Sequence, residues 1–324
     1  MDYVRLGRTA LKVSPLCLGT LNFGVRTTVD EAYGLMDAAL GHGINYFDTA
    51  NHYGWQVHRG LTEEIIGDWF AKGGGRREQV VLGSKVCNSM SDRPNDRGLS
   101  ARHIVAACED SLRRLKTDWI DLYQMHHADP DASWEEVWQA MELLVNQGKV
   151  RYVGSSNFTG WSLAAGQEKA NQRGFLGLVS EQCLYNLLSR QPELELIPAA
   201  NAYGIGVFAC SPLHGGLLGG GLRKLAAGTA VKTAQGRAQV AIETRRADVA
   251  AYEDLCADLG VDPAELAQAW LLDRPGVNGV VIGPRTAEHL DCAVHALKLE
   301  LDDSTRVALD RLFPPLTSQI PQAW

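Results

Sequence analysis

The feature that most constrains the fold of this chain is a regular alternation of short apolar runs with amphipathic helical patterns. Each run is continuous, as expected for strands of a parallel sheet that is covered on both faces. Eight strands alternating with helices predict an α/β fold, with a (β/α)8 TIM barrel as first choice. The eight runs are Pro15–Gly19, Asn45–Thr49, Val80–Val86, Ile120–His126, Tyr152–Ser155, Leu178–Gln182, Val207–Ser211 and Val280–Gly283.

An open, doubly wound sheet is the alternative. It would favour a GxGxxG loop after its first strand, whereas the first run here continues as LCLGTLNFG. The opening YVRLGRTALKV, with Gly7 and Arg8 between two short extended runs, predicts a β-hairpin that caps the floor of the barrel. The step from the seventh to the eighth run is longer than the other steps. We therefore predict a single domain, 1–324, with an insertion at about 217–246.

Composition excludes several classes of function. With 31 Lys and Arg against 38 Asp and Glu, the formal net charge is −7, which argues against a nucleic-acid binder with a basic face. The seven cysteines contain no CxxC pair, so we predict neither a disulfide scaffold nor a CxxC zinc site. The opening residues lack a secretory signal, and glycines interrupt the uncharged stretch Ala202–Leu222. We expect a cytoplasmic protein without a membrane segment.

Side chains suited to chemistry follow three consecutive strands. Asp48, Lys85 and His126 stand at the carboxyl ends of the second, third and fourth runs, and Tyr53 follows Asp48 in the next loop. Barrel enzymes build their active sites at this end of the strands. The set suits carbonyl reduction by hydride: a phenol gives the proton, an ammonium lowers the phenol pKa and is held by a carboxylate, and an imidazole orients the carbonyl oxygen.

Each of these residues also has a purely structural interpretation. Alone, Lys85 suits a solvated surface and Tyr53 suits ordinary loop packing, so only their joint spacing favours catalysis. The pair His126 and His127 suggests a metal site, but such a site needs a further ligand and only Asp129 offers itself. We therefore predict no metal.

In the segments FDTANHYG, GSKV and DLYQMH, the four residues resemble the catalytic tetrad of the aldo-keto reductases. The segments LGTLNFG, YVGSSNF, SEQCLYNLLSR, SPLHGGLL and IGPRTAEHL extend the resemblance, in family order, over nearly the whole chain. The resemblance implies an NADPH-dependent reductase in which Tyr53 delivers the proton.

The same resemblance implies a cofactor site. Ser156, Asn157 and Gln182 are expected at the nicotinamide carboxamide. Residues along the pyrophosphate path are expected to be Ser211, Leu213 and Gly215. Arg285 and Thr286 are expected at the adenosine 2′-phosphate, because a guanidinium suits a phosphate. The other expected cofactor contacts are Gly19, Thr20, Cys210, Gly283 and His289.

Two positions depart from the family pattern. Before the serine of SPL, the family commonly has a large aromatic that stacks on the nicotinamide, and this chain has Cys210. We expect the loss of this stacking to weaken cofactor binding by about 0.5–1.5 kcal/mol. At Cys292 and Ala293, many relatives carry polar groups for the adenine edge, so the adenine contacts are expected to differ.

The predicted insertion, LRKLAAGTAVKTAQGRAQV, together with YGWQVHRGLTEE and QMHHAD, is similar to ketoreductases of macrolide deoxysugar biosynthesis. These are often described as dTDP-4-keto-6-deoxyhexose 2,3-reductases, so the resemblance implies a nucleotide-linked keto sugar as substrate. Phe23, Trp55 and His127 are expected in the substrate pocket. Cations for the diphosphate are expected from Arg59, Arg223, Lys224, Lys232 and Arg237.

Two other functions stay open at this point. One is a broad-specificity aldehyde or ketone reductase without interest in nucleotides. The other is a cofactor-binding regulatory subunit similar to the channel-associated members of the superfamily, an idea to which Cys210 lends some weight. The intact tetrad favours an enzyme. The expected partner is a small-molecule substrate, without nucleic acid or membrane, and a homo-oligomer is left open.

Overall fold

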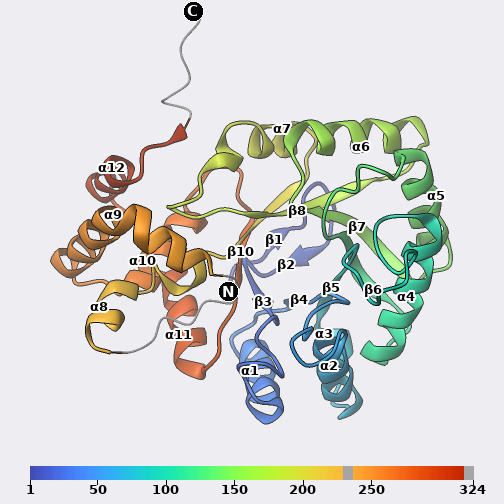
Figure 1. Ribbon diagram of the computed structural model, residues 1–324, viewed down its shortest axis with the longest axis horizontal. Helices are drawn as coiled ribbons and strands as arrows, with labels where there is room; N and C mark the ends of the chain where they lie inside the picture. Colours follow the sequence, from blue (N-terminus) through green and yellow to red (C-terminus); the bar gives the residue numbers. More distant parts are fainter. Residues whose placement is uncertain (229–235, 317–324) are drawn as a thin grey trace, which may run out of the picture.

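Eight parallel strands close into a barrel in the computed structural model, which describes residues 1–228 and 236–316 (Figure 1). The last strand pairs with both the seventh and the first, which closes the sheet. The predicted barrel is therefore confirmed and the open sheet is wrong. The strands are β3 (Leu16–Gly19), β4 (Tyr46–Asp48), β5 (Val81–Val86), β6 (Ile120–Met125), β7 (Val150–Ser156), β8 (Leu178–Leu184), β9 (Gly206–Cys210) and β10 (Gly279–Ile282).

Helices surround the barrel because each buries one apolar face against it. In α4, Ile104, Cys108 and Leu112 recur every four residues and are buried, whereas Arg113 on the opposite face is exposed. None of the helices in the described part of the chain is long and apolar enough to cross a membrane. The helices before the insertion are α1 (Val29–Gly41), α2 (Leu61–Ala71), α3 (Arg76–Gln79), α4 (Ala101–Leu115), α5 (Trp134–Asn146), α6 (Gly160–Gln172), η1 (Gln191–Glu193) and α7 (Leu196–Ala202).

The predicted hairpin closes the amino-terminal end of the barrel. Its strands β1 (Val4–Arg5) and β2 (Lys12–Val13) pair antiparallel. Leu6 is fully buried in an apolar cluster with side chains from inside the barrel. The Arg8 guanidinium donates a hydrogen bond of 2.8 Å to the carbonyl of Leu178, the first residue of β8. The hairpin thus leaves the carboxyl ends of the strands as the open end.

The segment between β9 and β10 is the long one, as predicted, but its end differs from the prediction. Helix α9 runs past 246 to its end at Leu259, with non-helical backbone angles at Arg245 (φ −129°, ψ 21°). A small apolar cluster that includes Leu217 and Ile242 packs this segment together. Part of the predicted insertion, 229–235, lies outside the described residues. The elements here and beyond are η2 (His214–Gly216), α8 (Gly221–Ala226), α9 (Arg237–Leu259), α10 (Pro263–Leu272), α11 (Ala287–Ala296) and α12 (Asp303–Leu312).

Candidate functional site

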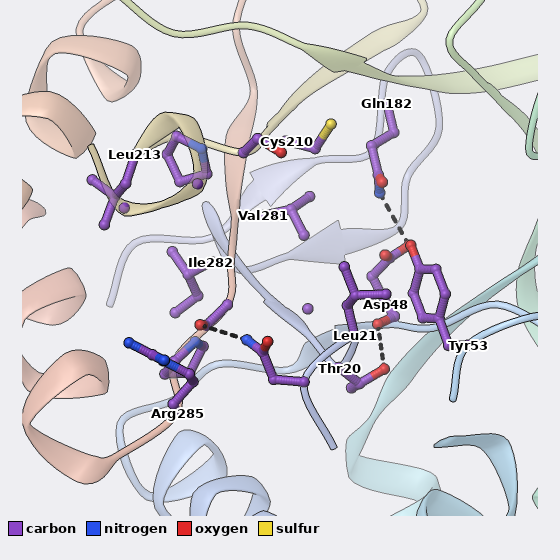
Figure 2. A pocket seen from close by; sticks show the side chains of 18 of the residues that line it. Thr20, Leu21, Asp48, Tyr53, Gln182, Cys210, Leu213, Val281, Ile282 and Arg285 are labelled. Atoms are coloured by element: carbon purple, nitrogen blue, oxygen red, sulfur yellow. Dashed lines mark hydrogen bonds between the residues drawn. The ribbon is translucent and has the colours of Figure 1, made fainter. Parts of the chain in front are cut away.

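A cavity of about 520 Å³ lies at the carboxyl ends of the barrel strands. Figure 2 shows Tyr53 and Gln182 on one side of it and Arg285 on the other. We call these the catalytic end and the cationic end. The predicted site residues that line the cavity are Gly19, Thr20, Asp48, Tyr53, Trp55, His126, His127, Ser156, Asn157, Gln182, Cys210, Ser211, Leu213, Gly215, Gly283, Arg285 and His289.

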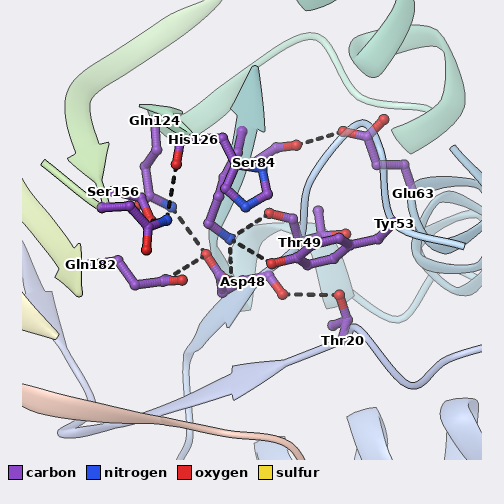
Figure 3. A network of polar contacts seen from close by, with 12 residues as sticks. Thr20, Asp48, Thr49, Tyr53, Glu63, Ser84, Gln124, His126, Ser156 and Gln182 are labelled. Carbon is purple, nitrogen blue, oxygen red and sulfur yellow. Dashed lines mark hydrogen bonds and ion pairs between the residues drawn. The ribbon is translucent and has the colours of Figure 1, made fainter. Parts of the chain in front are cut away.

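Three of the four residues predicted to be catalytic, Asp48, Tyr53 and His126, line the catalytic end (Figure 3), and the fourth, Lys85, contacts Asp48 and Tyr53 without lining the cavity itself. Asp48 ends β4, Lys85 lies on the adjacent β5, and His126 directly follows β6. The fully buried Lys85 ammonium donates to Asp48 Oδ2 at 2.5 Å and to the Thr49 carbonyl at 2.9 Å. It lies 3.4 Å from Tyr53 Oη. The Tyr53 ring packs edge-on against His126, with 5.8 Å between the ring centroids. Strand ends therefore hold the set together.

Two glutamines complete the surroundings of the Asp48 carboxylate. Gln124 Nε2 and Gln182 Nε2 each donate to Asp48 Oδ1 at 3.0 Å. Because Lys85 occupies Oδ2, both oxygens of this buried carboxylate are satisfied, as a buried charge requires. Gln124 was missed by sequence reasoning. Its signal is the spacing: it lies two residues before His126, and it stands opposite Lys85 in the sheet register.

Burial decides the protonation of the phenol. It raises the pKa of Tyr53 to about 12, and the lowering of this pKa by Lys85 only partly offsets it. Lys85 therefore lowers the pKa of Tyr53 as expected, but burial, which the sequence does not reveal, raises it by more. Burial lowers the pKa of Lys85, but Asp48 and Tyr53 outweigh this effect and leave it raised. At neutral pH the phenol keeps its proton and the ammonium keeps its charge.

The His126 imidazole is neutral at pH 7. Burial, followed by the charge of Lys85, lowers its pKa well below 6.5. Asn88 Nδ2 lies 3.1 Å from His126 Nδ1. Since an amide nitrogen only donates, Nδ1 accepts and the ring proton is on Nε2. The His127 ring stacks on His126 at 4.9 Å. The sequence did not predict Asn88, although it stands three residues after Lys85.

Among the described residues, no cluster of His, Cys, Asp or Glu is arranged to hold a metal.

Asn157 follows β7 and takes a left-handed backbone conformation (φ 59°). Its amide nitrogen donates to Ser156 Oγ at 2.9 Å and to the His126 carbonyl at 3.0 Å. The backbone N–H of the next residue, Phe158, donates to the fully buried Glu181 at 3.1 Å. Burial raises the pKa of Glu181 to about 8. These contacts fix the loop at a place where Asn157 and Ser156 line the cavity.

At the cationic end, three basic side chains converge from separate elements. Arg26 comes from the loop between β3 and α1, Lys224 from α8, and Arg285 from the loop between β10 and α11. Burial and the charge of Arg285 lower the pKa of Arg26. Neither guanidinium pairs with a carboxylate within residues 1–228 and 236–316. The sequence did not predict Arg26, because nothing in the segment LNFGVR distinguishes this residue from an ordinary loop arginine.

Thr286, which was predicted at the 2′-phosphate, does not line the cavity. Its hydroxyl caps α11 by accepting from His289 N at 3.4 Å.

The residues predicted for the substrate pocket separate into two groups. Trp55 lines the cavity and stacks on His52, with 5.2 Å between ring centroids. His127 lines it as well. Phe23, by contrast, is fully buried in the hydrophobic core. Arg59 lines a different cavity. The prediction of Phe23 and Arg59 at the substrate is therefore corrected.

The cations predicted in the insertion do not gather at the catalytic end. Arg223 lies beside the buried carboxylate of Glu253, with 3.6 Å between Arg223 Nε and Glu253 Oε2, and it donates to the backbone carbonyl of the same residue. Lys224 lines the cationic end and donates to a backbone carbonyl there. Lys232 and the side chain of Arg237 lie outside what the structure describes.

Comparison with known proteins finds a family model and relatives that match this chain over most or all of its length. The sequence model described as "Aldo/keto reductase family" matches residues 15–313. "Uncharacterized oxidoreductase YrpG" of Bacillus subtilis (strain 168) is 50% identical over 100% of this chain and 99% of its own length. "Probable voltage-gated potassium channel subunit beta" of Oryza sativa subsp. japonica is 34% identical over 87% of each chain. "Versiconal hemiacetal acetate reductase" of Aspergillus parasiticus is 30% identical over 97% of this chain and 98% of its own length.

Proposed function

We propose that this chain, which belongs to the aldo/keto reductase family, is an oxidoreductase that uses NADPH to reduce a carbonyl compound. The family uses nicotinamide cofactors, and the choice of NADPH is our proposal. One observation carries it: a single cavity has the protonated Tyr53 at one end and, at the other, the guanidinium of Arg285, which pairs with no carboxylate among the described residues. A proton donor and a cation suited to a phosphate therefore line the same cavity.

The residues present fit this cofactor. Asn157 uses its amide hydrogens on Ser156 and His126, so its Oδ1 remains to accept from a carboxamide N–H and the Ser156 hydroxyl remains to donate. Gly215 and Gly216 take positive φ angles of 72° and 97° on the cavity wall, where a backbone without Cβ admits a pyrophosphate. The cationic end suits a 2′-phosphate. When bound, the cofactor supplies the hydride.

The chain's own residues handle the proton. His126 donates from Nε2 to the carbonyl oxygen and orients it. Tyr53 Oη gives the proton to the same oxygen, because its raised pKa keeps it protonated until the reaction. Lys85 stabilises the phenolate that remains, and Asp48 holds the ammonium in place.

The side chain of Cys210 lies at the cavity where the family commonly has a stacking aromatic (Figure 2). A thiol contributes less contact area to a ring than an aromatic side chain does. We therefore expect NADPH to be held mainly by its two ends, the carboxamide contacts at Asn157 and the phosphate contacts at Arg285.

For the substrate, we propose a nucleotide-linked keto-deoxysugar, with small aldehydes and ketones as the alternative. The similarity of the insertion and of the segment around Trp55 supports the sugar. So does the stacked pair of Trp55 and His52 beside the catalytic end, because a flat ring face suits the apolar face of a sugar. The placement of Arg59 and Arg223 gives no support to the predicted diphosphate contacts.

A regulatory subunit is the rival from another class, since one relative is named as a potassium channel subunit. Turnover decides between the two. We would follow NADPH absorbance with benzaldehyde and with a dTDP-linked keto-deoxysugar, using Y53F as the control. Turnover that Y53F abolishes supports the enzyme, and absence of turnover with both substrates favours the regulatory role.

The nucleotide part of the proposal needs a separate measurement. We expect NADPH to raise the melting temperature more than NADH does, and thymidine diphosphate to raise it further in the presence of NADPH. If NADPH raises the melting temperature and thymidine diphosphate does not raise it further, small aldehydes and ketones become the proposed substrates instead of a nucleotide-linked sugar.

A further inference from the structure

A second cavity, of about 600 Å³, lies apart from the catalytic one, and no residue lines both. It is lined by the loop that precedes α2, the loop that precedes α4 and one face of α4. Four arginines line it, namely Arg59, Arg93, Arg102 and Arg114. Such a concentration of guanidinium groups around one space is typical of oxyanion binding.

The arginines differ in whether the protein neutralises them. Arg93 pairs with Asp96 at 2.7 Å, and Arg114 pairs with Glu63 at 2.8 Å. Asp110, the other carboxylate on the wall, pairs with Arg113 outside the cavity.

Arg59 and Arg102 have no carboxylate partner in the part of the chain that the structure describes. The one side-chain hydrogen bond of Arg59 is long, 3.4 Å to the Met90 carbonyl. Two unneutralised guanidiniums therefore share this space.

Two buried polar side chains on the same wall also lack partners. Asn51 is fully buried, and neither its amide oxygen nor its amide nitrogen has a hydrogen-bond partner among the described residues. His103, at 4% exposure, has an unpartnered Nε2. Buried polar groups are nearly always satisfied, because an unmade hydrogen bond in the interior is unfavourable. These atoms are themselves shielded from solvent, so they show an unsatisfied polar wall behind the cavity and not groups that a bound molecule would touch directly.

We propose that this second cavity binds a small molecule that carries a phosphate or carboxylate group, with Arg59 and Arg102 as the residues that hold the oxyanion. The planar guanidinium binds either group through paired N–H donors. Asn51 and His103 belong to the wall of the same cavity.

The site adjoins the catalytic residues through two connections. On one side, Arg114 holds the fully buried Glu63, and Glu63 accepts from Ser84 Oγ at 2.5 Å (Figure 3). Ser84 immediately precedes Lys85 on β5. On the other side, the Asn51 backbone N–H donates to the Lys85 carbonyl at 3.1 Å. An oxyanion in the second cavity would compete with Glu63 for Arg114. This competition would disturb the contact between Glu63 and Ser84, which is the neighbour of Lys85 in the chain. We therefore expect binding of an anion in the second cavity to change kcat.

Calorimetric titration of the full chain with inorganic phosphate, and separately with succinate, tests the site at constant ionic strength. The test variant is R59Q/R102Q. R246Q is the matched control, because Arg246 is an exposed arginine of α9, on the other side of the barrel from α4 (Figure 1). R285A identifies binding at the cationic end of the catalytic cavity.

We expect wild type and R246Q to bind at least one of the two anions with the same Kd, R285A to keep this binding and to lose only anion held at the cationic end, and R59Q/R102Q to bind it at least tenfold more weakly. If only phosphate binds, the ligand carries a phosphate group, and if only succinate binds, the ligand carries a carboxylate group. Absence of binding, equal binding by all variants, or a loss confined to R285A overturns the site. In the reductase assay, we expect the bound anion to change kcat at least twofold in wild type and not in R59Q/R102Q. An unchanged kcat in wild type overturns the connection to Lys85.

Discussion

The two ends of the catalytic cavity are built in opposite ways. At the catalytic end, Asp48 and Lys85 stand on adjacent strands, are buried, and have their charges matched by each other and by fixed hydrogen bonds. At the cationic end, Arg26, Lys224 and Arg285 come from two loops and a short helix, remain at least partly exposed, and have no carboxylate partner among the described residues.

The difference follows the physical task of each end. Proton transfer needs groups held at fixed distances in a dry environment, where electrostatic interactions are strong. Holding a phosphate needs only positive charge within reach, which solvated side chains can provide. We therefore expect substitutions at the catalytic end to have large effects that salt does not change, and substitutions at the cationic end to have small, salt-dependent effects.

The largest effect is expected for Y53F. Removal of the phenol proton should lower kcat by about 10³-fold or more, in the range of general acid catalysis, while the Kd for NADPH stays within about twofold. Stopped-flow or steady-state kinetics would measure kcat, and fluorescence titration the Kd. Y3F is the matched control, because the Tyr3 hydroxyl is exposed and bonds only a backbone carbonyl. Equal kcat in Y53F and wild type would contradict the role of Tyr53.

The next effect is on stability. K85M leaves the Asp48 carboxylate buried without its cation, and we expect the free energy of unfolding to fall by about 3–5 kcal/mol in urea denaturation. In the matched variant K116M, an exposed pair with Asp68 is lost, and the change should stay below about 1 kcal/mol. Similar losses in both variants would remove the contrast between buried and exposed charges.

Glu181 extends the contrast to pH. Its pKa is about 8 in the folded chain and 4.5 ordinarily, so between these values the native state holds a proton that the unfolded state has released. Wild-type stability should therefore fall as pH rises through this window. Because E181Q has no such proton, its unfolding free energy relative to wild type should rise by up to about 1.4 kcal/mol per pH unit. A difference that is constant with pH would show that Glu181 is ionised when folded.

The smallest effect is expected at the cationic end. R285A should raise the Kd for NADPH about tenfold, which is about 1.4 kcal/mol, and leave the Kd for NADH unchanged. R26A should act in the same direction, and the effects of both should shrink as ionic strength rises. Equal losses for NADPH and NADH would mean that the 2′-phosphate contacts other groups.

The sequence alone determined the barrel and the order of its catalytic residues. Parallel strands leave continuous apolar runs in a sequence, and the ends of the predicted runs lie within two residues of the ends of the observed strands. Once a barrel is predicted, its topology places all carboxyl strand ends together, so Asp48, Lys85 and His126 were found from spacing alone.

Only the tertiary structure decided which loop residues reach the site and how each group titrates. Phe23 and Arg26 are three residues apart in one loop, yet the first packs into the core and the second lines the cationic end. Loop paths depend on packing against elements distant in sequence, as when Arg26 and Arg285 line the same end of one cavity. Burial is likewise a property of the assembled fold, and it outweighs the effect of Lys85 on the pKa of Tyr53. Local patterns encode strands and helices, whereas solvent access and charge environment arise only when distant segments come together.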